Sequence, residues 1–351
     1  MPAVKLSSGK AAAVVGVITA LSVLLAAGPA SAGRGRGNGP AAGIKQPAGK
    51  AEGSSKSDGT LAAGVKGIVF DRSNNGGGSS AGAPAPVGNW SPPPCWYAPK
   101  YTPQQLKDEM EPIWAVDSTS PEWDEQQRKK YVKGGEYKDF NMKKTGDGFF
   151  WDSYTAEGFP PGWDACDKEP FWVDKGDPPP ADAPQAVTPE ILAQLAYAEI
   201  RVPGTEVDLA PDGTTKVNLA TWAWLDKGTF KPVSVTASVP EIGLSATTTA
   251  EPTSLHIDPG TADATALPGS GECPIVNGRI GEPWAKGKAD QTPPCGVTYR
   301  RSSDGGTYPL KATVTWKIHW STDDGVEHPL PDGEFGTTRN VTVQEIQSVN
   351  R

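Results

Sequence analysis

The ten residues Leu310-Lys311-Ala312-Thr313-Val314-Thr315-Trp316-Lys317-Ile318-His319 decide the fold class of this chain. Apolar and polar side chains alternate at every position, which is the period of a β-strand with one buried face. Burying the other face would leave Lys311 and Lys317 uncompensated in a dry core, which costs several kcal/mol for each charge. The pattern therefore predicts that Trp316 faces the interior and that His319 points to solvent or to a polar rim.

Similar alternation appears in the rest of the chain beyond residue 205. Residues 233–239 and 242–246 alternate in the same way, and Val341 with Val343 marks a final strand. Several short strands separated by turn residues are typical of an antiparallel sandwich rather than of a parallel sheet. We therefore expect residues 188–351 to form a helix followed by an antiparallel β-sandwich.

Residues 90–187 carry helix signals and aromatic loops in place of a continuous strand pattern. Thr102, Ser120 and Thr188 each stand as an N-cap residue before a proline at the first helical position. They predict helices over about residues 103–111 and 121–133, and a third that begins at residue 189. The expected fold is thus mainly β, with a small α+β, loop-rich region before the sandwich.

The first 32 residues have the order of a secretory signal peptide. Two lysines precede an uncharged run from Ala11 to Pro29, and Ala30-Ser31-Ala32 forms a small-residue cleavage site. Cleavage after Ala32 predicts a secreted, extracellular protein without a stable membrane span. The alternative is an uncleaved membrane anchor, because the apolar run approaches the roughly 18 residues that span a bilayer.

Residues 33–89 are rich in Gly, Ala, Ser and Pro, and they predict a disordered linker before a fold that begins at Trp90. Such a composition buries too little apolar surface to offset the entropy of ordering. The exception is the run Gly64–Phe70, which could add a short strand. An excess of basic side chains in this linker suits contact with an anionic cell-wall polymer, and a solvated linker is the alternative.

The formal net charge of −8 excludes the basic footprint of a nucleic-acid binder. No phosphate-binding loop motif occurs, so a nucleotide site is unsupported. Residues 78–82 match the G-x-S-x-G motif, but they lie in a glycine-serine stretch rather than between a strand and a helix. Asp323-Asp324 could bind Ca²⁺, although Asp-Gly pairs are common in turns for conformational reasons alone. The sequence therefore assigns no catalytic residue, no cofactor and no metal ligand.

Four cysteines in a secreted chain normally form disulfides. Three pairings are possible, and grouping by region favours Cys95–Cys166 and Cys273–Cys295. A zinc site is poorly supported, because the chain has no C-x-x-C and no histidine at ligand spacing from a cysteine. We expect both disulfides to be structural.

The stretch from Phe149 to Trp172 combines aromatic side chains with carboxylates. This mixture is typical of a sugar-binding groove or of a glycoside hydrolase that works with two carboxylates. It also suits the core of a small subdomain built around one disulfide, because aromatic side chains contribute large buried areas. The candidate ligand contacts are Trp151, Trp163 and Trp172.

Three segments resemble an uncharacterised family of secreted proteins of the actinomycete type. Residues 217–224, 295–303 and 308–316 are similar to its VNLPTWLW, C-x-x-TYRRSS and TATVTW segments. The last two also resemble the end of a PKD-type, immunoglobulin-like domain, whose WDFGDG hallmark is replaced here by residues 255–260. The resemblance covers about residues 188–350 and implies an Ig/PKD-like β-sandwich without catalytic residues.

Three functions follow as hypotheses. The first is a non-catalytic extracellular module with a structural or interaction role at the cell surface, bound to cell-wall polysaccharide or to another surface protein. The second is a carbohydrate-binding protein that uses the three tryptophans. The third is a secreted hydrolase with paired carboxylates.

Overall fold

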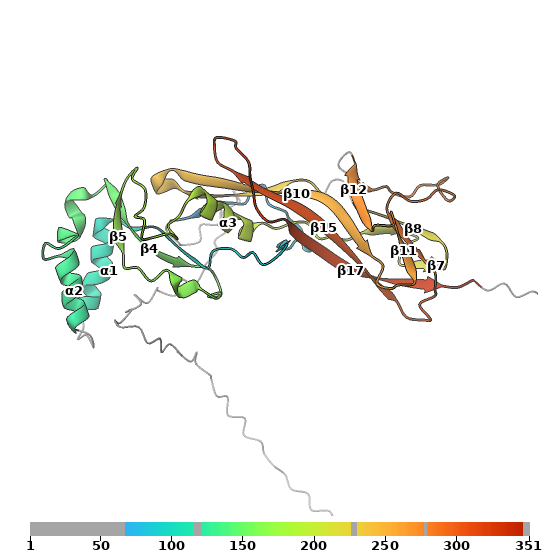
Figure 1. The fold of residues 1–351 in the computed structure, drawn as a ribbon, viewed down its shortest axis with the longest axis horizontal. Coiled ribbons are helices and arrows are strands. Elements are labelled where there is room, and N and C mark those ends of the chain that lie inside the picture. Colours follow the sequence, from blue (N-terminus) through green and yellow to red (C-terminus); the bar gives the residue numbers. More distant parts are fainter. Residues whose placement is uncertain (1–66, 116–120, 226–229, 277–278, 347–351) are drawn as a thin grey trace, which may run out of the picture. The chain divides into compact units, whose positions relative to one another are not determined.

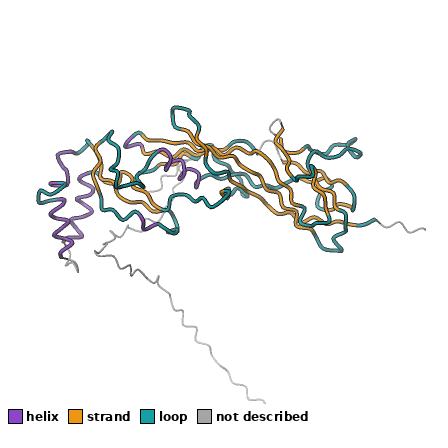
Figure 2. Tube along the Cα trace, viewed as in Figure 1, coloured by secondary structure: helices purple, strands orange, loops and turns teal. Residues whose placement is uncertain are grey.

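A computed structural model describes residues 67–115, 121–225, 230–276 and 279–346 (Figure 1). The chain divides into the units Met1–Pro40 and Ala41–Arg351, and every described residue belongs to the second. The expected signal peptide and linker residues 33–66 lie outside the described residues. Strands dominate, and the α-helices of the described residues lie at residues 103–115, 121–131 and 189–199 (Figure 2).

The elements are given in chain order, with α for helices, η for 3₁₀ turns and β for strands. They are β1 (Val69–Asp71), β2 (Ala85–Pro86), β3 (Cys95–Tyr101), α1 (Pro103–Ala115), α2 (Pro121–Tyr131), η1 (Lys138–Lys144), β4 (Gly148–Thr155), η2 (Trp163–Ala165), β5 (Phe171–Asp174), α3 (Pro189–Glu199), β6 (Asp208–Ala210), β7 (Thr214–Lys216), β8 (Ala220–Leu225), β9 (Val233–Val239), η3 (Pro240–Ile242), β10 (Leu244–Asp258), β11 (Ala264–Leu267), β12 (Glu272–Val276), β13 (Arg279–Gly281), β14 (Gly296–Tyr299), β15 (Tyr308–Ser321), β16 (His328–Pro329) and β17 (Gly333–Gln344).

The long strands β10 and β15 pair antiparallel, with a β-bulge between Pro252 and Ser254 (Figure 1). The side chains of β15 alternate as the sequence predicts. Trp316 is fully buried, and its ring lies 6.2 Å from that of Phe230. Lys317, its neighbour on the strand, is exposed. The predicted inward direction of Trp316 is therefore confirmed.

His319 lies on the face of β15 opposite to Trp316, as expected, but it is largely covered. Only 14% of its side chain is exposed, and its Nε2 lies 3.6 Å from the carboxylate of Glu327, whose own side chain is 71% exposed. Its strand neighbours are Thr249 of β10 and Pro329 of β16. His319 therefore lies at a polar rim, which is one of the two positions that the sequence predicts.

The sandwich arises because β10 takes part in two ladders. It pairs with β9 through residues 244–250 and with β12 through residues 254–256. From β12 the second ladder continues through β13, β8, β14 and β11, while β15 pairs with β17. The buried faces of both ladders belong to one hydrophobic cluster. This antiparallel, mainly β, sandwich-like architecture confirms the predicted fold class.

Both predicted disulfides are present. Cys273 of β12 is bonded to Cys295, the residue before β14, so this bridge joins two strands of the second ladder. Cys95 at the start of β3 is bonded to Cys166. The described residues contain no free cysteine. Each bridge removes chain entropy from the unfolded state and thereby stabilises its own region.

Helix α3 covers the sheet next to β9 and β10. The Thr188 hydroxyl accepts a hydrogen bond from the Ile191 amide at 3.2 Å, so the predicted N-cap is confirmed. Thr248 of β10 donates its hydroxyl hydrogen to the Ala193 carbonyl at 2.7 Å. This bond satisfies a buried hydroxyl and fixes the helix on the sheet.

The region before α3 has a three-stranded sheet, β3-β4-β5, and a helical part with its own core. Helices α1 and α2 contribute Leu106, Met110, Trp114 and Tyr131 to this core. The predicted end of the first helix before Pro112 is wrong, because α1 continues to Ala115. Pro112 lacks the amide N–H that would bond within the helix. Leu106, Met110 and Trp114 lie four residues apart on one buried face, and this burial compensates for the lost hydrogen bond.

The predicted linker over residues 33–89 is too long, because residues 67–86 belong to the fold. We call residues 67–86 the strap. Strand β1 pairs with β9 and strand β2 pairs with β17, so order begins well before Trp90. Both partners are strands whose edges accept an added strand. Backbone pairing with distant strands, rather than apolar periodicity, makes this segment part of the fold.

No helix among the described residues is long and apolar enough to cross a membrane.

Replacing Trp316 with Ala should lower the free energy of unfolding by ~3–5 kcal/mol, because a large side chain would leave a cavity in the core. Lys317→Ala, one residue along the same strand, is the matched control and should change it by no more than ~0.5 kcal/mol. Urea denaturation measures both values. Equal midpoints for the two variants would show that the register of β15 is misassigned.

Candidate functional site

The three candidate tryptophans do not form one surface. Trp151 lies on β4 and is 3% exposed, so it belongs to the core. Trp172 lies on β5, where it pairs with Phe150, while Trp151 pairs with Phe171. Side chains of successive residues alternate across a sheet, so Trp151 and Trp172 project from opposite faces. A groove lined by both is therefore excluded.

Trp172 is half-buried and has structural partners. Its indole Nε1 donates to the Asp174 carboxylate at 2.7 Å, and its ring meets Phe150 edge-on at 5.0 Å between centroids. The indole bond, with that of the Lys144 ammonium, lowers the pKa of Asp174. These contacts explain Trp172 as part of the sheet and its adjoining turn.

Trp163 is the one of the three that is exposed, at 46%. It lies in residues 156–166, which connect β4 to Cys166 and which we call the aromatic loop. Its ring meets that of Phe159 edge-to-face, with 5.3 Å between centroids and an angle of 77°. Phe159 is itself 62% exposed. The sequence analysis did not single out Phe159, although its position between glycine and proline argues against a place in a buried strand.

The carboxylates near these aromatic side chains divide into two kinds. Asp152 is buried and accepts from the Lys100 ammonium at 2.7 Å, and Glu169 accepts from Gln127 at 2.6 Å and Lys130 at 3.0 Å. Asp164 and Asp167 are exposed. Two of the four carboxylates that suggested a hydrolase therefore have structural partners.

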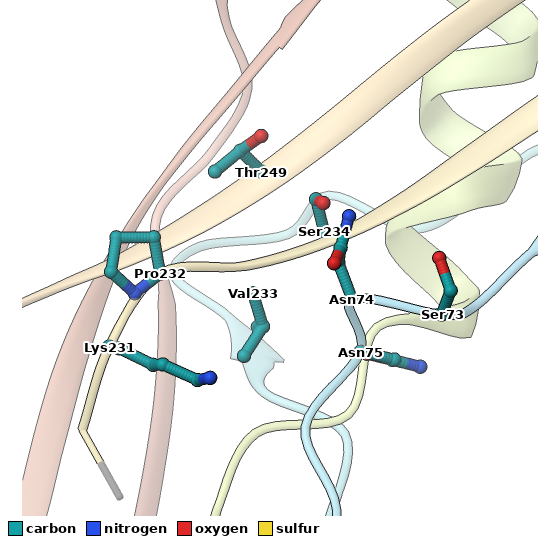
Figure 3. Close-up of a pocket in the computed structure, with 8 residues that line it drawn as sticks. All are labelled: Ser73, Asn74, Asn75, Lys231, Pro232, Val233, Ser234 and Thr249. Carbon is teal, nitrogen blue, oxygen red and sulfur yellow. The ribbon is translucent and has the colours of Figure 1, made fainter. Parts of the chain in front are cut away.

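A polar hollow of about 230 Å³ lies between the strap and the sheet (Figure 3). The strap residues Ser73, Asn74 and Asn75 form one wall, residues 231–234 form another, and Thr249 of β10 completes the lining. Hydroxyl, amide and ammonium groups are present, with no carboxylate or imidazole. This set can hold a small polar group by hydrogen bonds, but it offers no acid–base pair.

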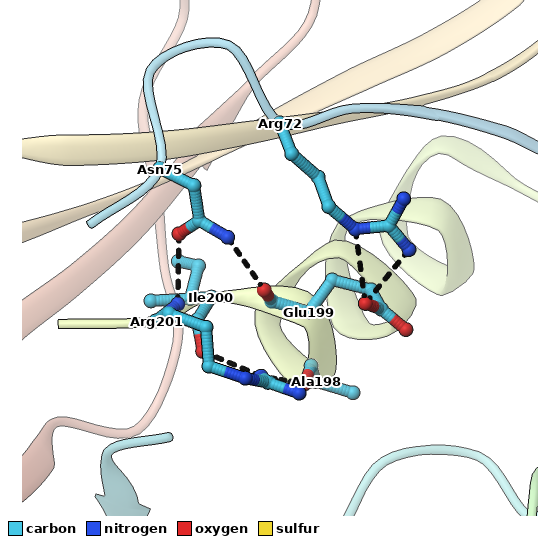
Figure 4. Close-up of polar contacts among 6 residues, drawn as sticks. All are labelled: Arg72, Asn75, Ala198, Glu199, Ile200 and Arg201. Carbon is cyan, nitrogen blue, oxygen red and sulfur yellow. Dashed lines mark hydrogen bonds and ion pairs between the residues drawn. The ribbon is translucent and has the colours of Figure 1, made fainter. Parts of the chain in front are cut away.

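The hollow owes its shape to a set of polar contacts between the strap and the end of α3, which we call the strap latch (Figure 4). Arg72 donates to the Glu199 carboxylate from Nε at 3.1 Å and from Nη2 at 2.8 Å. Asn75 donates to the Glu199 carbonyl at 2.9 Å, and its side-chain oxygen accepts from the Arg201 amide at 2.7 Å. The Gly76 amide donates to the Arg201 carbonyl at 2.8 Å. The strap is thus joined to the end of α3 by an ion pair and by hydrogen bonds, while Ile68 at its start is buried in the main hydrophobic cluster.

The remaining motifs of the sequence have structural roles here. Within the G-x-S-x-G match, Gly82 pairs with Val202, which places it in the strap rather than at a strand-to-helix turn. Asp324 accepts bonds from the Val326 amide and the Thr322 hydroxyl within a turn, and these bonds lower its pKa. The described residues hold no group of three or more potential metal ligands.

Every carboxyl pKa shift resolved among the described residues is downward. Asp182 is an example, because the Lys168 ammonium hydrogen-bonds to it and lowers its pKa. A general acid near neutral pH needs a raised carboxyl pKa instead. The resolved carboxyl shifts in the described part of the chain thus arise from hydrogen bonds to the carboxylates and from nearby lysines.

Replacing Asn75 with Ala should lower the free energy of unfolding by ~1–2 kcal/mol, because the Glu199 carbonyl and the Arg201 amide lose their side-chain partner. Amide hydrogen exchange should become faster in residues 69–76 and stay unchanged in the core of α1 and α2. Ser73→Ala is the matched control in the same turn. Unchanged exchange in residues 69–76 would contradict the role given to the strap latch.

Comparison of the chain with protein-family models, with curated proteins and with solved structures gave no match.

Proposed function

We propose that this protein is a secreted, non-catalytic extracellular module with a structural or interaction role at the cell surface. The observation that carries the proposal is that the cysteines and most of the candidate acid–base side chains already have structural partners. The cysteines are bridged, and Asp152 and Glu169 are paired with cations. His256 lies 2.8 Å from the Glu272 carboxylate on neighbouring strands, and His328 stacks on Trp320 at 4.5 Å. Side chains with such partners support a structural role rather than a catalytic one.

Extracellular location is supported by two independent features. The N-terminal 32 residues have the pattern of a cleaved signal peptide. Two disulfides favour an oxidising compartment, because cytosolic thiols are kept reduced. The resemblance to secreted actinomycete-type proteins and to PKD-like domains is part of the same proposal, and the antiparallel sandwich supports it.

A role in contact rather than catalysis is also supported by the exposed side chains. Trp163 and Phe159 expose two neighbouring aromatic rings, and such exposed apolar groups mark interaction sites. The partner proposed is cell-wall polysaccharide or another surface protein. The glycoside-hydrolase alternative would need two free carboxylates across a cleft, whereas Asp152 and Glu169 are already paired.

The full chain should be expressed in a secreting bacterial host, and the medium, wall and membrane fractions should be analysed by mass spectrometry. We expect a mature N-terminus at Gly33, intact disulfides, and protein in the medium or wall fraction. Retention in the membrane fraction with an uncleaved N-terminus would contradict secretion.

The purified secreted protein should show no turnover of glycan, ester or peptide substrates above that of a heat-denatured sample. Turnover of a glycan that is lost in the Asp164→Asn variant would contradict the non-catalytic role. The Asp177→Asn variant, altered at an exposed carboxylate outside residues 156–166, is the control for a general loss of charge.

A further inference from the structure

The exposed rings of Phe159 and Trp163 do not contribute to the hydrophobic cores. Neither ring belongs to a hydrophobic cluster of the described residues. Phe159 has a φ of 50°, in the left-handed region that bulky residues rarely adopt. Glycine would occupy this position without strain, so phenylalanine is here at a conformational cost, and its ring contact is with the exposed Trp163 rather than with the core. Strained residues of this kind gather at binding sites and active sites.

The aromatic loop is held at both ends. The Ala156 amide donates to the Pro94 carbonyl at 3.0 Å, and the disulfide Cys95–Cys166 fixes the other end. Inside the loop, the Trp163 amide donates to the Pro160 carbonyl at 3.0 Å. The backbone of the loop is therefore held in place before any ligand arrives, which reduces the entropy lost on binding.

The surroundings of the rings define the chemistry of a ligand. Glu157 and Asp164 are exposed carboxylates in the loop, and ionised carboxylates only accept hydrogen bonds. Residues 156–166 contain no Lys or Arg. A ligand that fits needs an apolar face to lie on a ring and O–H or N–H donors around its edge. A pyranose ring with equatorial substituents has this form.

We propose that Trp163 and Phe159 form a binding site for one pyranose unit of an uncharged extracellular polysaccharide. The inference rests on the proposed function and names the ligand of that module. The carboxylates disfavour an anionic polymer at this loop. A protein partner would need about 800 Å² on each side, whereas the exposed large apolar side chains of residues 156–166 are these two alone.

The test uses the mature full chain and two soluble probes, the β-1,4-linked hexasaccharides of glucose and of N-acetylglucosamine, in isothermal titration calorimetry. We expect binding of at least one probe and a loss of about tenfold or more in the Trp163→Ala variant. Trp284→Ala is the matched control, because Trp284 is 44% exposed and lies outside the aromatic loop. Its affinity should stay within about twofold of the unmodified protein.

A second variant, Phe159→Gly, separates binding from folding. Glycine relieves the positive φ, so the thermal midpoint should not fall, while the affinity for the hexasaccharide should decrease. An unchanged affinity in this variant would overturn the assignment of Phe159. Equal loss of affinity in Trp163→Ala and Trp284→Ala, or no binding of either probe, would overturn the site.

Tetramethylammonium chloride serves as the competing probe, since aromatic rings beside carboxylates also attract quaternary ammonium groups. Binding of this cation at Trp163 without binding of either hexasaccharide would overturn the inference. Failure of the inference is distinguishable from failure of the proposed function. A protein that is secreted and without turnover, but binds no hexasaccharide, retains the proposed function and loses this site.

Discussion

The antiparallel register of β10 and β15 is the constraint on which the rest of the structure depends. A slip of one residue would turn Trp316 outward and Lys317 inward, so the register fixes which face is core. Because β10 pairs with β9 in one half and with β12 in the other, it connects the sheet under α3 to the second ladder of the sandwich. The strap then adds its strands to β9 and β17, and its residues Ser73, Asn74 and Asn75 form one wall of the polar hollow.

Local signals predicted much of the fold. The alternation of β15, the N-cap of Thr188 and the two disulfides all depend on residues close in sequence or on simple grouping, and all are confirmed. The sequence indicated a short strand within residues 64–70, where β1 begins, but it did not indicate the rest of the strap, because the bonds that hold the strap reach residues more than a hundred positions away, such as Glu199. The end of α1 was missed because the tertiary burial of Trp114 outweighs the local effect of a proline.

The sequence indicated the residue types of the candidate site, but not which of its side chains are exposed together. Trp151 and Trp163 lie in the same aromatic, acidic stretch, so the sequence does not distinguish them. Trp151 is buried and Trp163 exposed because β4 lies in a sheet, which only the structure shows. One unused signal was the sequence Gly158-Phe159-Pro160-Pro161-Gly162, which favours a loop that displays its aromatic residue. The hollow draws on three distant segments, and no local pattern indicates it.

The most direct test is an NMR titration of the ¹⁵N-labelled mature protein with the hexasaccharide that binds. The account predicts that chemical-shift changes concentrate in residues 156–166 and include the indole N–H of Trp163. Amides of β10 and β15 should not shift, because the frame is preorganised. Changes centred instead on Ser73–Asn75 and residues 231–234 would place binding in the polar hollow and contradict the aromatic site.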